Sequence, residues 1–280
     1  MDSNARAELY TLSIRISADG FCFSLSNVLT KNILGFMRQT FDNKLTFDTS
    51  LSRAIKTLPF LKKDYKKIDI IVPDSEYTTV PESFFRPDTA SEYLRFNSHS
   101  YENGAQVLTD YIAPFSMYLL SHTDRTLYDT LKKEFPSARF HCRLAPLAYY
   151  LSSKCPVDDK GKMYIVLKDS SIDVLGIRKR KLLFMNSFHD IDFDNLLYYI
   201  LGVWKSSGLS QKEDTLFLIC DRRPDNRFIT RLNEFIKHIC EFRLDNKITL
   251  LGEEHPDGFE PNMDLSDVSS EILAITLCEW

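Results

Sequence analysis

The sequence predicts an α/β protein made of two tandem halves, each with the element order β-β-β-α-β-α-β, and an inserted subdomain in the first half. Three observations support this prediction. Apolar residues alternate with other residues on both sides of an Asp-Gly pair near the N-terminus, which is the pattern of a β-hairpin. Two blocks of sequence in the first half recur in the second half. The spacing between these blocks is about 50 residues longer in the first half, which indicates an insertion there.

The first half, residues 1–153, begins with the predicted hairpin. Its first strand starts at Tyr10 and its second follows the turn at Asp19 and Gly20. A third strand is expected from Ile33 to Phe41, followed by a short helix over about residues 49–58.

The insertion is expected at about residues 60–112, as short strands and helices. After it, residues 117–144 follow the order strand, polar turn, amphipathic helix, strand, and residues 216–244 repeat this order. An apolar pair four residues apart marks the helix in each copy, namely Leu127 with Leu131 and Phe228 with Leu232.

The second half, residues 154–280, is joined to the first by a polar hinge at residues 151–162 that contains Pro156 and Gly161. Strands are predicted on both sides of a polar turn at residues 169–171 and of a basic turn, "RKRK", at residues 178–181. A helix should then begin near Asp192. The acidic stretch 253–267 is interpreted as a loop, and the last helix is expected to pack on the second sheet.

This arrangement resembles the actin-like ATPase superfold, a duplicated ribonuclease-H-like domain shared by actin, heat-shock chaperones and sugar kinases. Because the insertion lies in the first half, the bacterial cell-division and pilus-assembly branch is the most similar. The segments "IDIIVPDSEYTTVPESFF" and "FPSARFHCRLAPL" also resemble an uncharacterised bacterial family of about this length. The resemblance covers most of residues 9–250 and implies two ribonuclease-H-like halves facing one another across a cleft.

The resemblance also implies where a nucleotide would bind. In nucleotide-binding members, the first turn of each half carries an acidic residue and several glycines, close to D-x-G-x-G. The corresponding residues here are Asp19 and Gly20 in the first turn, and Asp169, Ser170 and Ser171 in the second. Only one glycine accompanies the two acids, and the whole chain has only 9 glycines. A simple chain reversal at Asp19-Gly20 therefore explains this turn better than a phosphate-binding loop.

Several classes of chemistry have little support in the sequence. The net charge of −4 argues against a general nucleic-acid binder. The first strand carries no acid for a two-metal nuclease, and the acids at 190, 192 and 194 lack the glycine and glutamate of a calcium loop. No catalytic residue and no metal ligand can be assigned.

The sequence therefore predicts a non-catalytic cytoplasmic protein, with no membrane span, that binds a protein partner through an actin-like frame with a degenerate nucleotide site. Four aromatic residues of the insertion, Tyr77, Phe84, Phe85 and Tyr93, are candidates for the partner surface, although they could equally form the core of the insertion. The alternative is an ATPase or kinase with Mg-ATP between Asp19 and Asp169. A homo-oligomeric structural protein is a third possibility.

Overall fold

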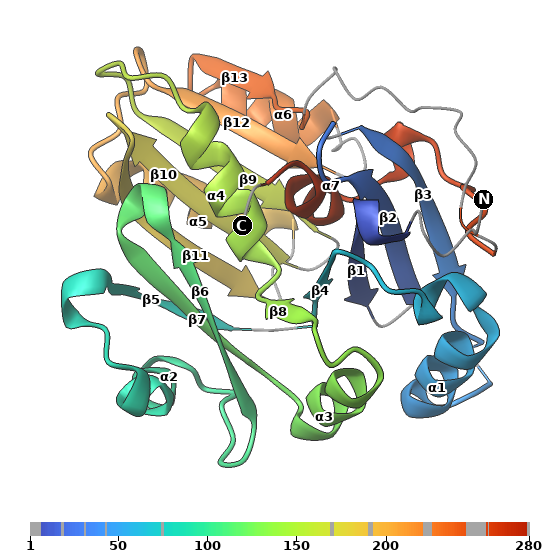
Figure 1. The fold of residues 1–280 in the computed structure, drawn as a ribbon. Coiled ribbons are helices and arrows are strands. Elements are labelled where there is room, and N and C mark those ends of the chain that lie inside the picture. The colour runs from blue at the N-terminus through green and yellow to red at the C-terminus, as the bar shows by residue number, and fades with distance from the viewer. Residues whose placement is uncertain are drawn as a thin grey trace.

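The part of the chain that the structure describes contains two five-stranded mixed sheets and one smaller three-stranded sheet (Figure 1). The structure is a computed structural model. It describes residues 7–17, 20–30, 32–42, 44–73, 76–168, 171–189, 193–220, 226–244, 256 and 258–278.

The first sheet has the strand order β3-β2-β1-β4-β8. The first three strands pair antiparallel, and β4 and β8 then add in parallel to β1. The bounds are β1 (Tyr10–Ser17), β2 (Gly20–Asn27), β3 (Ile33–Thr40), β4 (Lys67–Ile71) and β8 (Arg139–His141).

The second sheet repeats this order and these directions as β11-β10-β9-β12-β13. Because both the order and the pairing are the same, the predicted duplication is confirmed. The bounds are β9 (Lys162–Leu167), β10 (Ser171–Arg178), β11 (Lys181–His189), β12 (Thr215–Cys220) and β13 (His238–Glu241).

Amphipathic helices cover one face of each sheet. The predicted pair Leu127 and Leu131 packs into the core of the first half, and Phe228 and Leu232 pack into that of the second. Asp124 caps its helix as expected, since its carboxylate accepts a hydrogen bond from the backbone N–H of Leu127 at 2.8 Å. These helices are α1 (Phe47–Thr57) and α3 (Arg125–Glu134) in the first half, and α5 (Phe193–Ser206) and α6 (Asn226–Asn233) in the second.

The insertion forms the third sheet, in the order β5-β7-β6, with one helix and a small core of Val80, Leu94 and Leu120. Its elements lie between residues 77 and 123, so its bounds differ from the expected 60–112. The sequence match of residues 117–123 with the strand at 216–220 is wrong. The strand equivalent to β12 is β4, because β4 pairs with β1 as β12 pairs with β9, whereas residues 117–123 pair with the insertion's own strands. The bounds are β5 (Tyr77–Pro81), α2 (Ala90–Asn97), β6 (Gln106–Ile112) and β7 (Met117–Thr123).

Helices α4 (Leu144–Lys154) and α7 (Ser270–Leu277) pack against each other between the two large sheets (Figure 1). Their apolar residues belong to one cluster that includes side chains of both sheets, for example Ile71 and Leu175. Short 3-10 turns complete the described structure at Ala7–Leu9, Pro59–Lys62, Glu82–Phe84, Pro87–Thr89, Ala113–Phe115 and Leu265–Asp267.

The last helix does not pack on the second sheet alone, as the sequence suggested, but returns to the first half. It packs on β1 and β2, and the hydroxyl groups of Ser24 and Thr276 lie 2.6 Å apart. Just before α7, the side chain of Asn262 hydrogen-bonds to the backbone of Arg38 in β3. The helix is buried on nearly all sides, so it needs apolar neighbours from more than one sheet.

Candidate functional site

The two turns of the predicted nucleotide site occupy equivalent places, between β1 and β2 and between β9 and β10. Asp19, Asp169 and Ser170 lie outside the described residues. Gly20 and Ser171 are described and are the first residues of β2 and β10. The structure therefore locates both turns at the same position of the duplicated unit.

The conformation of Gly20 has an explanation within the sheet. Its φ is +148°, and a Cβ atom added there would lie 2.2 Å from the backbone oxygen of Gln39 in β3. A contact that short with backbone cannot be relieved by a side-chain movement. The packing of β2 against β3 thus requires glycine at this position without any ligand.

Beside these turns, a group of charged residues around two buried carboxylates connects the two halves. Arg15 of β1 and Lys168, at the end of β9, both pair with Glu271 of α7, at 3.3 and 3.0 Å. The side chain of Glu271 is 2% exposed. Because Arg15 and Lys168 precede the first and second turns, a single carboxylate links the two strands that lead into them.

The same group extends into the second half through Asp173 of β10. Lys168 pairs with Asp173 at 3.2 Å, Arg143 at the start of α4 binds the carboxylate through both terminal nitrogens, and Ser187 donates a hydrogen bond. We call Arg15, Arg143, Lys168, Asp173 and Glu271 the junction network. Its three cations are neutralised largely by its two buried carboxylates. The described residues contain no cluster of three or more His, Cys, Asp or Glu side chains arranged to hold a metal ion.

A second buried charged cluster joins the insertion to the first sheet. His141 of β8 lies between Asp110 of β6, at 2.6 Å, and Asp69 of β4, at 3.1 Å. Asp69 also pairs with Lys67 at 2.9 Å and with Arg139 at 3.0 Å.

The ionisation of this cluster follows from its charges. Burial alone lowers the pKa of His141, but the carboxylates of Asp110 and Asp69 outweigh burial and raise that pKa to about 9. Burial opposes ionisation of Asp69, but His141 and Lys67 hold its pKa below the ordinary value. His141 is therefore a cation at neutral pH. The sequence analysis missed this cluster, although an acid inside the apolar run "KIDII" was a usable signal.

The four predicted partner-surface aromatics have three different environments. Phe85 and Tyr93 pack on the core of the insertion, and the hydroxyl of Tyr93 donates to the carbonyl of Phe84 at 2.6 Å. The hydroxyl of Tyr77 is buried at the junction, where burial and the nearby Asp173 raise its pKa well above the ordinary value. Phe84 is 70% exposed, and Phe96, which the sequence analysis did not single out, is 90% exposed.

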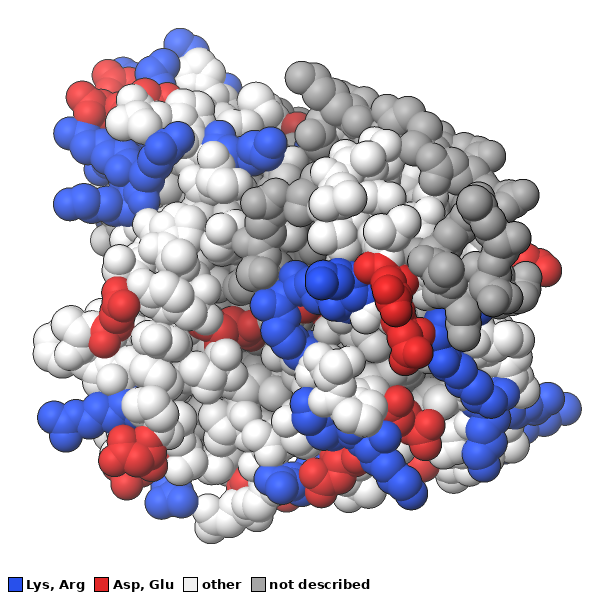
Figure 2. Space-filling view, viewed as in Figure 1, with Lys and Arg blue, Asp and Glu red and all other residues white. Residues whose placement is uncertain are grey.

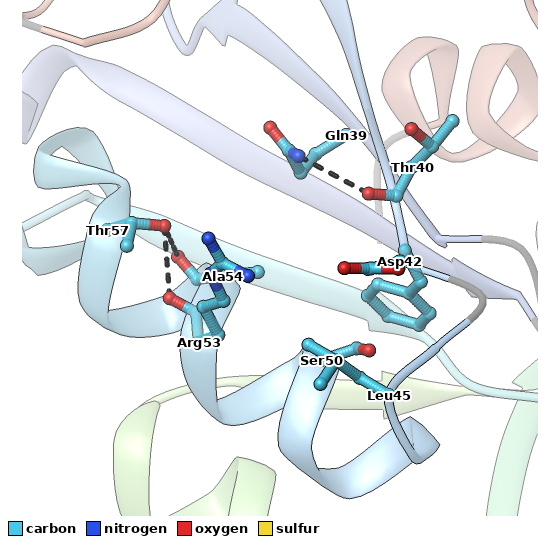
Figure 3. Close-up of a pocket in the computed structure, with 9 residues that line it drawn as sticks. Gln39, Thr40, Asp42, Leu45, Ser50, Arg53, Ala54 and Thr57 are labelled. Carbon is cyan, nitrogen blue, oxygen red and sulfur yellow. Dashed lines mark hydrogen bonds between the residues drawn. The ribbon is translucent and has the colours of Figure 1, made fainter.

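A pocket of about 490 Å³ lies between the end of β3 and α1, as Figure 3 shows. Its polar groups include Arg53 and Thr57 of α1 and Gln39 and Asp42 from β3 and the loop after it. It is on the α1 side of the first sheet, whereas α7 and the junction network are on the other side. No predicted site residue lines it.

The fold and the two equivalent turns define a protein with an actin-like ATPase fold. A crystal structure from Bacteroides thetaiotaomicron, described as having an actin-like ATPase fold and unknown function, is similar with a TM-score of 0.80 and 25% identity over 100% of both chains. The chain belongs to the family described as "Protein of unknown function (DUF3822)", whose model matches residues 2–239. Both findings confirm the resemblance drawn from the sequence.

A structure of the PilM–PilN type IV pilus biogenesis complex shares the fold, with a TM-score of 0.61 and 10% identity over 96% of this chain and 98% of that one. No curated protein matches the sequence. Within the described residues, no helix combines the length and the apolar character needed to cross a membrane.

Proposed function

We propose that this protein is a non-catalytic actin-like module that acts by binding other proteins and whose nucleotide site is degenerate. The observation that carries the proposal is the junction network. Glu271 and Asp173 are buried beside the strands that lead into both turns, and they already pair with Arg15, Lys168 and Arg143. A triphosphate entering this region would meet two carboxylates and would compete with them for the same cations.

The scarcity of glycine supports the same proposal. Backbone N–H groups can wrap a phosphate closely where glycines allow it. Here the one glycine of the first turn is already required by the contact between β2 and β3. The second turn, residues 169–171, has none.

A second candidate function is an ATPase or kinase with Mg-ATP in the cleft between the halves. One observation favours it: Asp19 and Asp169 precede β2 and β10 in the two copies of the same unit, so that an acid is present in both turns. The two functions make opposite predictions for nucleotide binding.

Thermal unfolding with and without Mg-ATP separates them. A site filled at 100 times its dissociation constant adds about 2.7 kcal/mol, which raises the Tm of a chain this size by at least a degree or two. We expect no rise with millimolar Mg-ATP. A rise that is abolished by Asp19→Asn but kept in Asp48→Asn, an exposed acid of α1, would establish the nucleotide-dependent function instead.

For the partner surface, we propose the exposed aromatics of the insertion, with Phe84 as the main contact and Phe96, which is on the same subdomain, as a second. The PilM structure, which contains PilN, supports the idea that this fold can serve as a protein-binding frame. Phe85 and Tyr93 would support this surface from beneath, whereas Tyr77 packs at the junction between the halves and would not contact the partner.

The test is cross-linking and co-purification from the native host with the wild-type chain and with Phe84→Ser. We expect Phe84→Ser to keep the wild-type Tm and to lose the co-purifying protein. The matched control is Leu29→Ser, which also removes an exposed apolar side chain, 80% exposed in the wild type, but from the first half. Equal recovery of the same partner by both variants would rule out this surface.

A further inference from the structure

Two segments of the second half form one surface at the end of the molecule where α4 leads into β9. They are residues 154–160, which follow α4, and residues 178–181, the turn between β10 and β11. The two segments contact each other: Arg180 Nε donates to the carbonyl of Cys155 at 3.2 Å, and Lys179 pairs with Asp159 at 2.8 Å. We call them together the basic turn surface.

This surface has a charge opposite to that of the whole chain. It carries six cationic side chains and two carboxylates, so it has four positive charges in excess, whereas the chain has a formal net charge of −4. The upper left of Figure 2, over the end of α4 and the β10–β11 hairpin, shows this gathering of cationic side chains. The six cations are Lys154, Lys160, Arg178, Lys179, Arg180 and Lys181, and the carboxylates are Asp158 and Asp159.

Within the described residues, most of these cations have no carboxylate partner. Arg178 pairs with the buried Asp214 at 2.9 Å, and the Lys179–Asp159 pair is exposed. In the part of the chain that the structure describes, Lys154, Lys160, Arg180 and Lys181 form no ion pair. Like charges held this close repel one another, so the cluster does not serve the stability of the fold.

The backbone of the turn supports the same conclusion. Lys179 and Arg180 have φ values of +53° and +59°, and they form the two-residue loop of the hairpin. Such a loop favours Asn-Gly, because both central residues need a positive φ, which residues with a long side chain rarely adopt. The sequence therefore departs from the best local choice at a position that is exposed and charged, as is typical of functional sites.

We infer that the basic turn surface binds an acidic segment of a protein partner. This inference rests on the proposed function and names the chemistry of the partner. Arg and Lys side chains recognise carboxylates through charge-assisted hydrogen bonds.

A protein segment fits this surface better than a nucleic acid or a lipid headgroup layer does. Asp158 and Asp159 lie within the surface and would repel a continuous row of phosphates. Val157, which belongs to the same surface and is 73% exposed, offers an apolar contact. A mixture of cations, a few acids and an exposed apolar side chain suits a peptide that combines carboxylates with an apolar residue.

The test is fluorescence anisotropy with a labelled Glu-rich peptide that carries one Leu, at physiological ionic strength, using the full chain. The variant is K179N/R180G, which removes two charges and installs the residues that the turn prefers. The relief of strain in the turn should offset the loss of the Arg180–Cys155 hydrogen bond and the Lys179–Asp159 pair, so the Tm should stay within roughly 2–4 °C of the wild type. The Kd for the peptide should increase roughly two- to thirty-fold, as expected for the loss of two exposed ion pairs.

The matched control is K62Q/K66Q, which removes two exposed cations from the first half and should leave the Kd unchanged. The inference is overturned if the wild type does not bind the peptide, if K179N/R180G binds it as tightly as the wild type, or if K62Q/K66Q weakens binding equally. Binding to phosphatidylserine vesicles or to a single-stranded oligonucleotide but not to the peptide would also overturn it. A rise in Tm with Mg-ATP would contradict the proposed function. The Kd for the peptide would still test the basic turn surface by itself.

Discussion

Buried charged residues in this protein are tolerated because each has partners placed by other elements. Asp69, Asp173 and Glu271 are at most 2% exposed, and each lies within 3.3 Å of at least two cationic groups. An unpaired carboxylate in such a position would lose far more hydration free energy than its contacts with the protein interior could recover. These residues therefore mark where separate elements must meet.

Gly20 shows the opposite case, in which a side chain is excluded by the backbone. We expect Gly20→Ala to lower the free energy of unfolding by about 1–3 kcal/mol, because the new Cβ would meet the carbonyl of Gln39 and because φ is positive. Urea unfolding measures this loss. Gly202→Ala is the control: Gly202 lies in α5 with open space around it, so alanine there should add about 0.5–1 kcal/mol. An unchanged stability of Gly20→Ala would remove the steric explanation for this glycine.

At the scale of elements, the insertion is held to the first sheet by charge as well as by packing. His141 sits on β8, the shortest strand of the sheet, and connects β4 to β6 through two carboxylates. Cys142 N–H adds a hydrogen bond to Asp110 at 2.8 Å. His141 and Cys142, at the edge strand of the first sheet, therefore also fix the position of the three-stranded sheet of the insertion.

The protonation of His141 should make this attachment dependent on pH. The pKa of His141 rises from 6.5 to about 9 on folding. Its stabilising contribution is therefore complete below pH 6.5 and is lost as the pH rises through about 9. Urea unfolding between pH 6 and pH 10 should show this decline in the wild type.

In His141→Gln, Asp110 loses its cation while Asp69 keeps Lys67 and Arg139, and we expect a loss of about 3–5 kcal/mol at pH 7. The difference in stability between wild type and variant should shrink above pH 9. His189→Gln, which replaces an exposed histidine at the end of β11, is the control and should leave the free energy of unfolding at pH 7 unchanged. A constant difference between wild type and His141→Gln from pH 6 to pH 10 would show that folding does not raise the pKa of His141.

For the whole molecule, α7 and the junction network couple the two halves. Helix α7 belongs to the second half by sequence but packs on strands of the first, and its Glu271 contacts cations from both. The predicted division at residues 153 and 154 falls in the last turn of α4, and the C-terminal segment crosses back to the first half. We expect the halves to unfold together.

Replacing Glu271 should weaken this coupling. In Glu271→Gln the cations Arg15 and Lys168 lose their shared carboxylate, but they are 21% and 22% exposed and can regain water. The expected loss is therefore about 1–3 kcal/mol, below the range for fully buried pairs. Differential scanning calorimetry should show one transition for the wild type and a lower, broader one for the variant.

Glu234→Gln, which breaks the exposed pair of Glu234 with Arg231, should change the free energy of unfolding by less than about 0.5 kcal/mol. If Glu271→Gln unfolds as sharply and at the same temperature as the wild type, the junction network does not couple the halves.

The order of strands and helices could be predicted from the sequence because it depends on local patterns. Alternation over residues 10–25, the Asp-Gly turn and the apolar pairs of α3 and α6 act over a few residues, and the spacing of the two copies indicated the duplication. The identity of one strand required the tertiary structure. Whether residues 67–71 or 117–123 supplied the fourth strand of the first sheet could not be read from local pattern, since both segments are apolar and strand-like.

The sequence by itself determined the duplicated unit and the positions of its two turns. Only the tertiary structure decided that α7 crosses to the first half, that Glu271 joins Arg15 to Lys168, and that His141 lies between Asp69 and Asp110. The physical reason is that a local pattern shows only which face of an element is apolar. The partner of a buried charge depends instead on contacts between residues up to about 250 positions apart.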